Sequence, residues 1–155
     1  MKTLIVYYSR TGNTDKIARM LQEKLNCDIE RITDNDKYKG TLGFIKGGFN
    51  AVSGRGTTIN QCSKNPEEYD LIIIGTPVWA GTLAVPVNTY IMQNKEKFKR
   101  KVACFTTCAS SGYEKTIKEL SKRCEKSLSA TLSITEDDLN NPSEKINTFI
   151  NKIKN

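Results

Sequence analysis

The chain has 155 residues, of which 37% are hydrophobic and 26% are charged, and its 24 basic and 17 acidic side chains give a formal net charge of +7. This composition is typical of one globular domain and excludes wholesale disorder, while apolar runs as short as Leu71–Ile74 are too short to span a bilayer. The basic side chains are scattered along the chain, which favours solubility and general attraction of anions over a nucleic-acid site.

The first half of the chain alternates strand and helix patterns. Thr3–Tyr8 is a continuous apolar run, and we interpret it as a buried strand because no signal-peptide cleavage site follows it. In Asn13–Leu25 the apolar residues lie on one helical face. Cys27–Ile32 predicts a short strand with charges between apolar residues. Thr41–Ser53 predicts a helix that is weakened by Gly47 and Gly48.

The second half continues the alternation. Leu71–Gly75 and Lys101–Phe105 predict two further buried strands, and Gly112–Glu125 predicts an amphipathic helix between the latter strand and the next. Leu128–Ile134 alternates apolar and polar residues, as a strand with one solvated side does. A final helix is predicted after Asn141-Pro142, with the proline at its first position.

The character of the strands predicts their order. Strands one, three and four are unbroken apolar runs, which suits central positions covered by helices on both faces, whereas strands two and five are mixed, which suits the edges. The order is then 2-1-3-4-5 in an α/β fold: a five-stranded, doubly wound parallel sheet in three layers. The dinucleotide-binding order would bury strand two and fits less well. We find no linker or repeat and expect residues 1–155 to form one domain.

In such a sheet, ligands bind beyond the carboxyl ends of the strands, where the winding reverses. The loop after strand one leads directly into a helix, where free backbone N–H groups and the helix dipole attract anions. Its hydroxyls and glycine can surround a phosphate monoester, and it matches neither the nucleoside-triphosphate nor the dinucleotide glycine motif. The alternative is a simple helix start. The candidate phosphate-binding residues are Ser9, Arg10, Thr11, Gly12, Asn13 and Thr14.

The loop after strand three contains the only tryptophan of the chain. A tryptophan is most often a core or interface residue, but an indole at a ligand-facing strand end can stack on a flat ring. Proline stiffens this loop and glycine permits close approach of a ligand. The candidate ring-binding residues are Thr76, Pro77, Val78, Trp79, Ala80 and Gly81, followed by Thr82.

The loop after strand four has small and hydroxyl side chains that leave room for the edge of a ring. Tyr113 either stacks on the ring or begins the helix. Cys108, near a helix N-terminus, has a rival interpretation as a nucleophile of lowered pKa. The candidate residues here are Thr107, Cys108, Ala109, Ser110, Gly112 and Tyr113, within the segment that begins at Thr106.

The five cysteines are an odd number without a C-x-x-C pair, and histidine is absent from the sequence. These observations predict neither a disulfide framework nor a zinc site, and they remove the commonest general base. We therefore name no catalytic residue and no metal site. Reduced thiols indicate a cytoplasmic protein.

The segments Tyr7–Thr14 and Thr76–Thr82 together resemble the flavodoxin family, and the similarity extends over essentially the whole chain. It is to the short-chain type, since Leu128–Ile134 runs on to the last helix without a long insertion. The resemblance implies FMN as cofactor, with Ser9–Thr14 on the phosphate, Pro77–Gly81 against the isoalloxazine and Thr107–Tyr113 around its edge. Two departures from carrier flavodoxins are the basic charge of this chain and the absence of acids from Thr76–Thr82.

The resemblance implies an electron-transfer protein that cycles bound FMN between oxidised, semiquinone and hydroquinone states. The alternative is an FMN-dependent NAD(P)H:quinone-type reductase, an oxidoreductase whose substrate pocket Gly40–Cys62 would supply. A third candidate, a binding module that has lost the flavin, fits poorly with intact loops. From the basic charge we expect redox partner proteins with acidic docking faces, no nucleic-acid or membrane partner, and a monomer or weak dimer.

Overall fold

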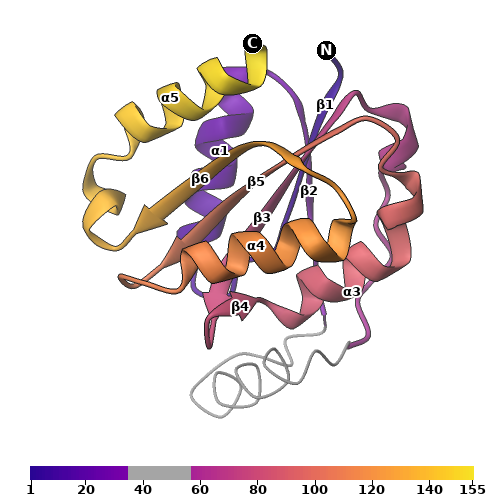
Figure 1. Ribbon diagram of the computed structural model, residues 1–155, viewed down its shortest axis with the longest axis horizontal. Helices are drawn as coiled ribbons and strands as arrows, with labels where there is room; N and C mark the ends of the chain where they lie inside the picture. Colours follow the sequence, from indigo (N-terminus) through magenta and orange to yellow (C-terminus); the bar gives the residue numbers. More distant parts are fainter. Residues whose placement is uncertain (35–56) are drawn as a thin grey trace.

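The computed structural model describes residues 1–34 and 57–155, and these form a parallel sheet covered by helices on both faces (Figure 1). The strand order is β2-β1-β3-β5-β6, with β4 paired antiparallel to the end of β3. Leaving β4 aside, this is the predicted order 2-1-3-4-5. The predicted helix Thr41–Ser53 lies outside the described residues.

The elements have the following bounds. The strands are β1 (Thr3–Tyr7), β2 (Asp28–Arg31), β3 (Leu71–Trp79), β4 (Thr82–Leu83), β5 (Lys101–Cys108) and β6 (Leu128–Thr135). The helices are α1 (Asn13–Leu25), α3 (Val85–Asn94), α4 (Tyr113–Cys124) and α5 (Ser143–Lys154), with 3-10 turns η1 (Pro66–Glu68), η2 (Lys95–Lys97) and η3 (Asp137–Asn140). Among the described helices, none is both long and apolar enough to cross a membrane.

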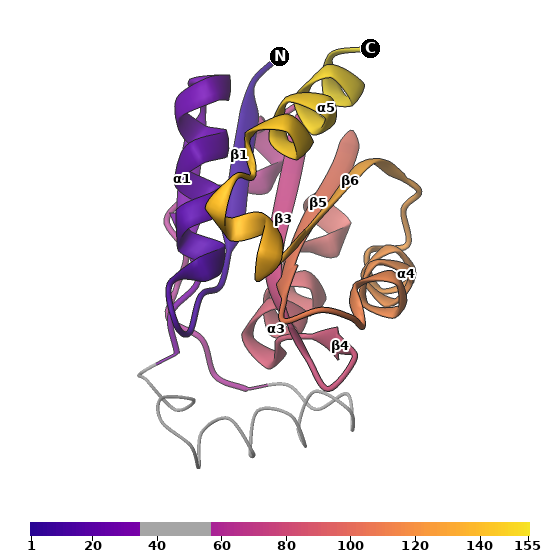
Figure 2. The same cartoon turned by 90° about the vertical axis from the view of Figure 1, so that its left-hand side faces the viewer.

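Alternate residues of the central strands pack into two hydrophobic cores, one on each face of the sheet. Ile5, Tyr7 and Phe105 pack with the apolar faces of α1 and α5, whereas Val6 and Cys104 point to the face covered by α3 and α4. Figure 2 shows α1 on one side of the strands and α3 and α4 on the other. The central strands read as unbroken apolar runs because both of their faces are buried.

Gly75 allows the central strands to pack closely. A Cβ at Gly75 would lie 2.2 Å from the ring of Phe105 and 2.8 Å from the Cβ of Tyr7, its neighbours on β5 and β1. Contacts below 3.0 Å require atoms to move, so the aromatic ring occupies the space that the glycine leaves.

The structure corrects several predicted boundaries. β3 continues to Trp79 and β5 to Cys108, so Thr76–Trp79 and Thr106–Cys108 belong to strands and not to loops. The last helix begins at Ser143, one residue after the proline that was predicted to open it. Neither β4 nor α3 was predicted. α3 is buried over Val85–Ile91, and a helix that is apolar on most sides has little amphipathic periodicity to reveal it.

Candidate functional site

The turn between β1 and α1 presents an open backbone at the carboxyl edge of the sheet. Gly12 caps α1 with a φ of 107°, and a Cβ built there would meet no atom within 4 Å. Its N–H donates to Ser9 Oγ at 3.1 Å. Because the cap is a glycine without a side-chain acceptor, the amides of the first helical turn remain available to an anion.

A network of ion pairs and hydrogen bonds around Asp15 and Arg31 contacts this turn. Arg31, the last residue of β2, donates to the carbonyl oxygen of Ser9 at 3.1 Å and lies 3.8 Å from Asp15 Oδ1. Asp15 also accepts hydrogen bonds from Tyr7 Oη and from Arg19 Nε, the latter at 2.8 Å. Burial and the bond to Asp15 raise the pKa of Tyr7 to about 12. Burial alone would raise the pKa of Asp15, but the bonds from Arg19 and Tyr7 outweigh it and lower that pKa.

The second predicted segment is a β-hairpin. Ala80 and Gly81 have φ values of 49° and 74°, and a two-residue hairpin turn of type I′ requires positive φ at both positions. The hydroxyl of Thr76 is used within the hairpin region, since it accepts from the N–H of Ala84 at 2.9 Å and donates to the carbonyl of Pro77 at 2.8 Å. The hairpin turn packs on the start of α4. A Cβ built at Gly112, the N-cap residue of α4, would lie 3.3 Å from the Cα of Gly81.

Trp79 does not stand on a loop as predicted. It is the last residue of β3, its side chain is 3% exposed, and its ring meets that of Tyr8 edge to face, with centroids 5.5 Å apart and an interplanar angle of 88°. It nevertheless contributes to the wall of the cavity described next.

One cavity of about 300 Å³ brings the three segments together. It lies where β1, β3 and β5 end, at the point of the sheet where the winding reverses. Its lining consists of Arg10, Thr11, Asn13, Thr14, Pro77, Val78, Trp79, Thr107, Cys108, Ala109 and Glu136. The other predicted site residues, which are Ser9, Gly12, Thr76, Ala80, Gly81, Ser110, Gly112 and Tyr113, are not in this lining.

Two residues of the site region were not predicted. Glu136 directly follows β6, and its N–H donates to the carbonyl of Ala109 at 3.1 Å. Arg31 is the last residue of β2. Both lie at carboxyl ends of strands, so the rule that located the three loops would have found them if it had been applied to the edge strands as well.

Cys108 is a half-buried thiol at the end of β5. Burial and the nearby carboxylate of Asp138 raise the pKa of Cys108, so the thiol form prevails at neutral pH. Nucleophilic cysteines need the opposite shift. The structure therefore argues against the interpretation of Cys108 as a nucleophile. Tyr113 is the first residue of α4.

The sheet order and the cavity at its carboxyl edge define a protein of the flavodoxin-like class. The chain belongs to the flavodoxin family: the family model described as "Flavodoxin" matches residues 2–153. No curated protein sequence matches the chain.

Solved structures support the same fold. A flavoprotein from Lactobacillus acidophilus, in complex with FMN, is 23% identical, with a TM-score of 0.75 and coverage of 96% of this chain and 98% of that one. The apo form of the Lactobacillus acidophilus flavoprotein has a TM-score of 0.64 at 23% identity, with coverage of 90% and 95%. Oxidised flavodoxin 1 from Bacillus cereus is 16% identical, with a TM-score of 0.57 and coverage of 99% and 98%.

Proposed function

We propose that this chain is an FMN-binding flavodoxin that carries electrons between redox partner proteins. The observation that carries the proposal is a cavity of about 300 Å³, which joins an anion-attracting helix start to an aromatic wall at the reversal of the sheet. That volume is at the lower end of the range found for sites of small molecules and cofactors.

The chemistry of the first turn fits a phosphate monoester. The open space beside Gly12, the first amides of α1 and the hydroxyls of Thr11 and Thr14 offer several donors to one dianion. Within the described residues, the cavity is lined by one turn of this kind, through Arg10, Thr11, Asn13 and Thr14, which suits the single phosphate of FMN better than the diphosphate of FAD.

The other walls fit a flat ring. Pro77, Val78 and Trp79 form an apolar side, while Cys108 and Ala109 are small enough to admit a ring edge. FMN, when bound, supplies the electron-accepting and electron-donating chemistry, and the protein contributes orientation and electrostatics. The FMN complex of the similar Lactobacillus acidophilus flavoprotein supports this assignment.

The decisive experiment is to purify the protein, release its chromophore by denaturation and identify it by chromatography. We expect stoichiometric FMN, either as isolated or after reconstitution. FAD in its place, or no flavin binding after reconstitution, would overturn the proposal.

A second measurement separates a carrier from the alternative reductase. The holoprotein is mixed with NADH or NADPH and a quinone under anaerobic conditions. A carrier reacts slowly with both nicotinamides, whereas rapid turnover would favour the reductase. The segment expected to form the reductase pocket, Gly40–Cys62, lies mostly outside the described residues.

A further inference from the structure

The turn that follows β6, which we call the β6 turn (Glu136–Asn140), reaches the wall of the candidate flavin cavity. Glu136 lines the cavity, and both of its backbone polar groups are bonded. Its N–H donates to the carbonyl of Ala109, another lining residue, at 3.1 Å, and its carbonyl accepts from the N–H of Leu139 at 3.2 Å. The place of the Glu136 side chain therefore depends on how firmly the β6 turn itself is held.

Asp138 anchors the β6 turn to two elements. Its Oδ2 accepts from the backbone N–H of Thr135 at 2.8 Å and from the hydroxyl of Thr135 at 2.9 Å, which ties the turn to the end of β6. The same oxygen accepts from Lys145 Nζ of α5 at 2.7 Å. Hydrogen bonds to an ionised carboxylate are stronger than neutral ones, and three donors on one oxygen hold the carboxylate in one orientation.

Lys16 anchors the same turn to a third element, α1. Its Nζ donates to the carbonyl oxygen of Leu139 at 2.8 Å. Lys16 lies two residues after Thr14, which lines the cavity from the first turn of α1. The side chain of Leu139 packs against the hydrophobic core that α1 and α5 share. The helix that begins at the candidate phosphate-binding turn therefore also holds the turn that carries Glu136.

We propose that Lys16 and Asp138 are positioning residues, which keep Glu136 in the cavity wall and thereby set the redox potential of the bound flavin. This inference rests on the proposed FMN-binding function. A carboxylate beside the flavin destabilises its anionic reduced form, so the potential is lower when Glu136 is held close. Among the described residues that line the cavity, neither Lys16 nor Asp138 is included, so each acts through the β6 turn and not by contact with the flavin.

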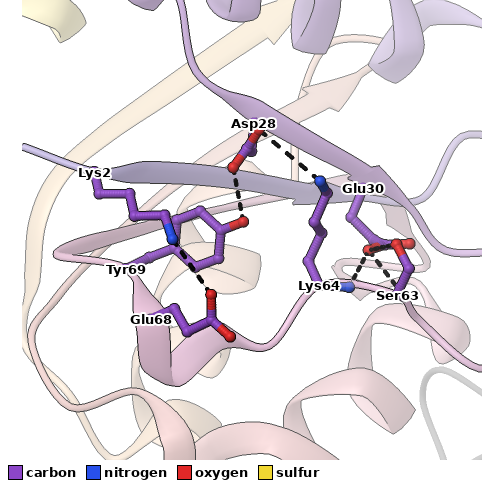
Figure 3. Close-up of polar contacts among 7 residues, drawn as sticks. All are labelled: Lys2, Asp28, Glu30, Ser63, Lys64, Glu68 and Tyr69. Atoms are coloured by element: carbon purple, nitrogen blue, oxygen red, sulfur yellow. Dashed lines mark hydrogen bonds and ion pairs between the residues drawn. The ribbon is translucent and has the colours of Figure 1, made fainter.

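Glu30, on the other edge strand β2, provides a comparison. Its Oε2 also has three donors: the backbone N–H of Ser63 at 3.1 Å, the hydroxyl of Ser63 at 3.0 Å and the backbone N–H of Lys64 at 2.7 Å (Figure 3). This carboxylate holds a neighbouring segment of the chain beside β2, and Glu30 is not among the described residues of the cavity lining. Glu30→Gln is therefore a matched control for Asp138→Asn, because it weakens a similar anchor away from the cavity.

The first test follows amide hydrogen exchange at Glu136 by NMR in the purified chain. Lys16→Met removes one donor to the β6 turn and should speed exchange of the Glu136 N–H about fivefold, as the loss of one hydrogen bond predicts. Asp138→Asn should speed it as well. Two controls should leave it unchanged: Glu30→Gln, and Lys24→Met, which removes the same charge in the last turn of α1. Exchange at the wild-type rate in Lys16→Met or in Asp138→Asn would overturn the role given to that residue.

The second test measures the second one-electron potential of the FMN-loaded protein. Removal of a cation by itself lowers this potential, whereas release of Glu136 raises it, so we expect a less negative potential in Lys16→Met than in the wild type. In a Glu136→Gln background Lys16→Met should lose that effect, and Asp138→Asn should shift the potential less than it does alone. A lower potential in Lys16→Met, or shifts that add strictly, would contradict the inference. A wild-type chain that binds no FMN would instead overturn the proposed function, and the redox role with it, whatever the exchange rates show.

Discussion

The hydroxyls of Thr14 and Thr107 lie 2.8 Å apart in the interior, although 93 positions separate the two residues in the sequence. Thr14 is in the first turn of α1 and Thr107 is near the end of β5. The contact therefore joins the candidate phosphate-binding turn to the segment that we expect around the edge of the flavin ring. One hydroxyl donates and the other accepts, so the proton of the accepting hydroxyl is left to donate to a ligand.

We predict that Thr14→Val and Thr107→Val each destabilise the protein by about 1–3 kcal/mol, because each leaves a buried hydroxyl without its partner. The double variant should be less destabilised than the sum of the two, since no polar group is then left unpaired. Chemical denaturation of the four proteins gives the coupling energy. Strict additivity would show that the hydroxyl contact contributes nothing to stability.

The network around Arg31 leads to a prediction about phosphate selectivity. Arg31→Met removes the donor to the Ser9 carbonyl and should reduce the preference for FMN over riboflavin by about 1 kcal/mol, or roughly fivefold. Arg19→Met is the matched control, since Arg19 binds the same Asp15 from the exposed side. Flavin titrations check this, and an equal effect of the two variants would contradict a specific role for Arg31.

Trp79 gives a spectroscopic test because it is the only tryptophan of the chain. Its place in the cavity wall predicts strong quenching of its fluorescence when FMN binds. Trp79→Phe should weaken FMN binding by about 1 kcal/mol while preserving most of the packing against Tyr8. If FMN binding leaves the fluorescence unchanged and Trp79→Phe leaves the affinity unchanged, Trp79 contributes only to packing of the core.

Asp138 should make stability depend on acid pH. Hydrogen bonds from Lys145 and from Thr135 lower its pKa to about 2. Because the folded pKa is below the unfolded value of about 3.9, the contribution is present above about pH 4 and is lost as the pH falls toward 2. We expect Asp138→Asn to lose about 1 kcal/mol at pH 6, because solvent screens this partly exposed ion pair, and to show a flatter pH dependence between 4 and 2. Asp137→Asn, at the exposed neighbouring position, should retain the wild-type profile.

Glu136 bears on the redox potential of bound flavin. The net charge of +7 and the absence of acids from Thr76–Thr82 predict a second one-electron potential less negative than in an acidic short-chain flavodoxin, and lower when salt is added. Glu136 in the cavity wall opposes that field. Glu136→Gln should therefore raise the potential; a charge that acts over roughly 10 Å at an effective dielectric of about 20 is equivalent to about 1–2 kcal/mol. Spectroelectrochemical titration at two salt concentrations measures both effects, and a potential that rises with salt would contradict the role given to net charge.

The sequence was informative wherever burial left a periodic pattern. The apolar runs of β1, β3 and β5 and the mixed edge strands predicted the sheet order, because covered strands must be apolar on both sides. The same reasoning missed α3, which is buried on most sides, and β4, whose two residues are too short to show a pattern. Tertiary pairing with β4 and β5 also extends β3 to Trp79, beyond the point where Pro77 suggested that it ended. Three of the loops at the site were found from the ends of the central strands, whereas Glu136 and Arg31 were missed because the same rule was not applied to the edge strands β6 and β2.

Gly75 makes the cavity sensitive to a substitution that never touches a ligand. The residue sits in a row across the sheet with Tyr7 and Phe105, just before the ends of the three strands that deliver the site. Gly75→Ala would push the Phe105 ring or the Tyr7 side chain aside, and a displaced strand carries its loop with it. Flavin affinity therefore depends on the spacing of these strands, and the interior of the sheet requires a glycine at position 75 even though this residue is not in the cavity lining.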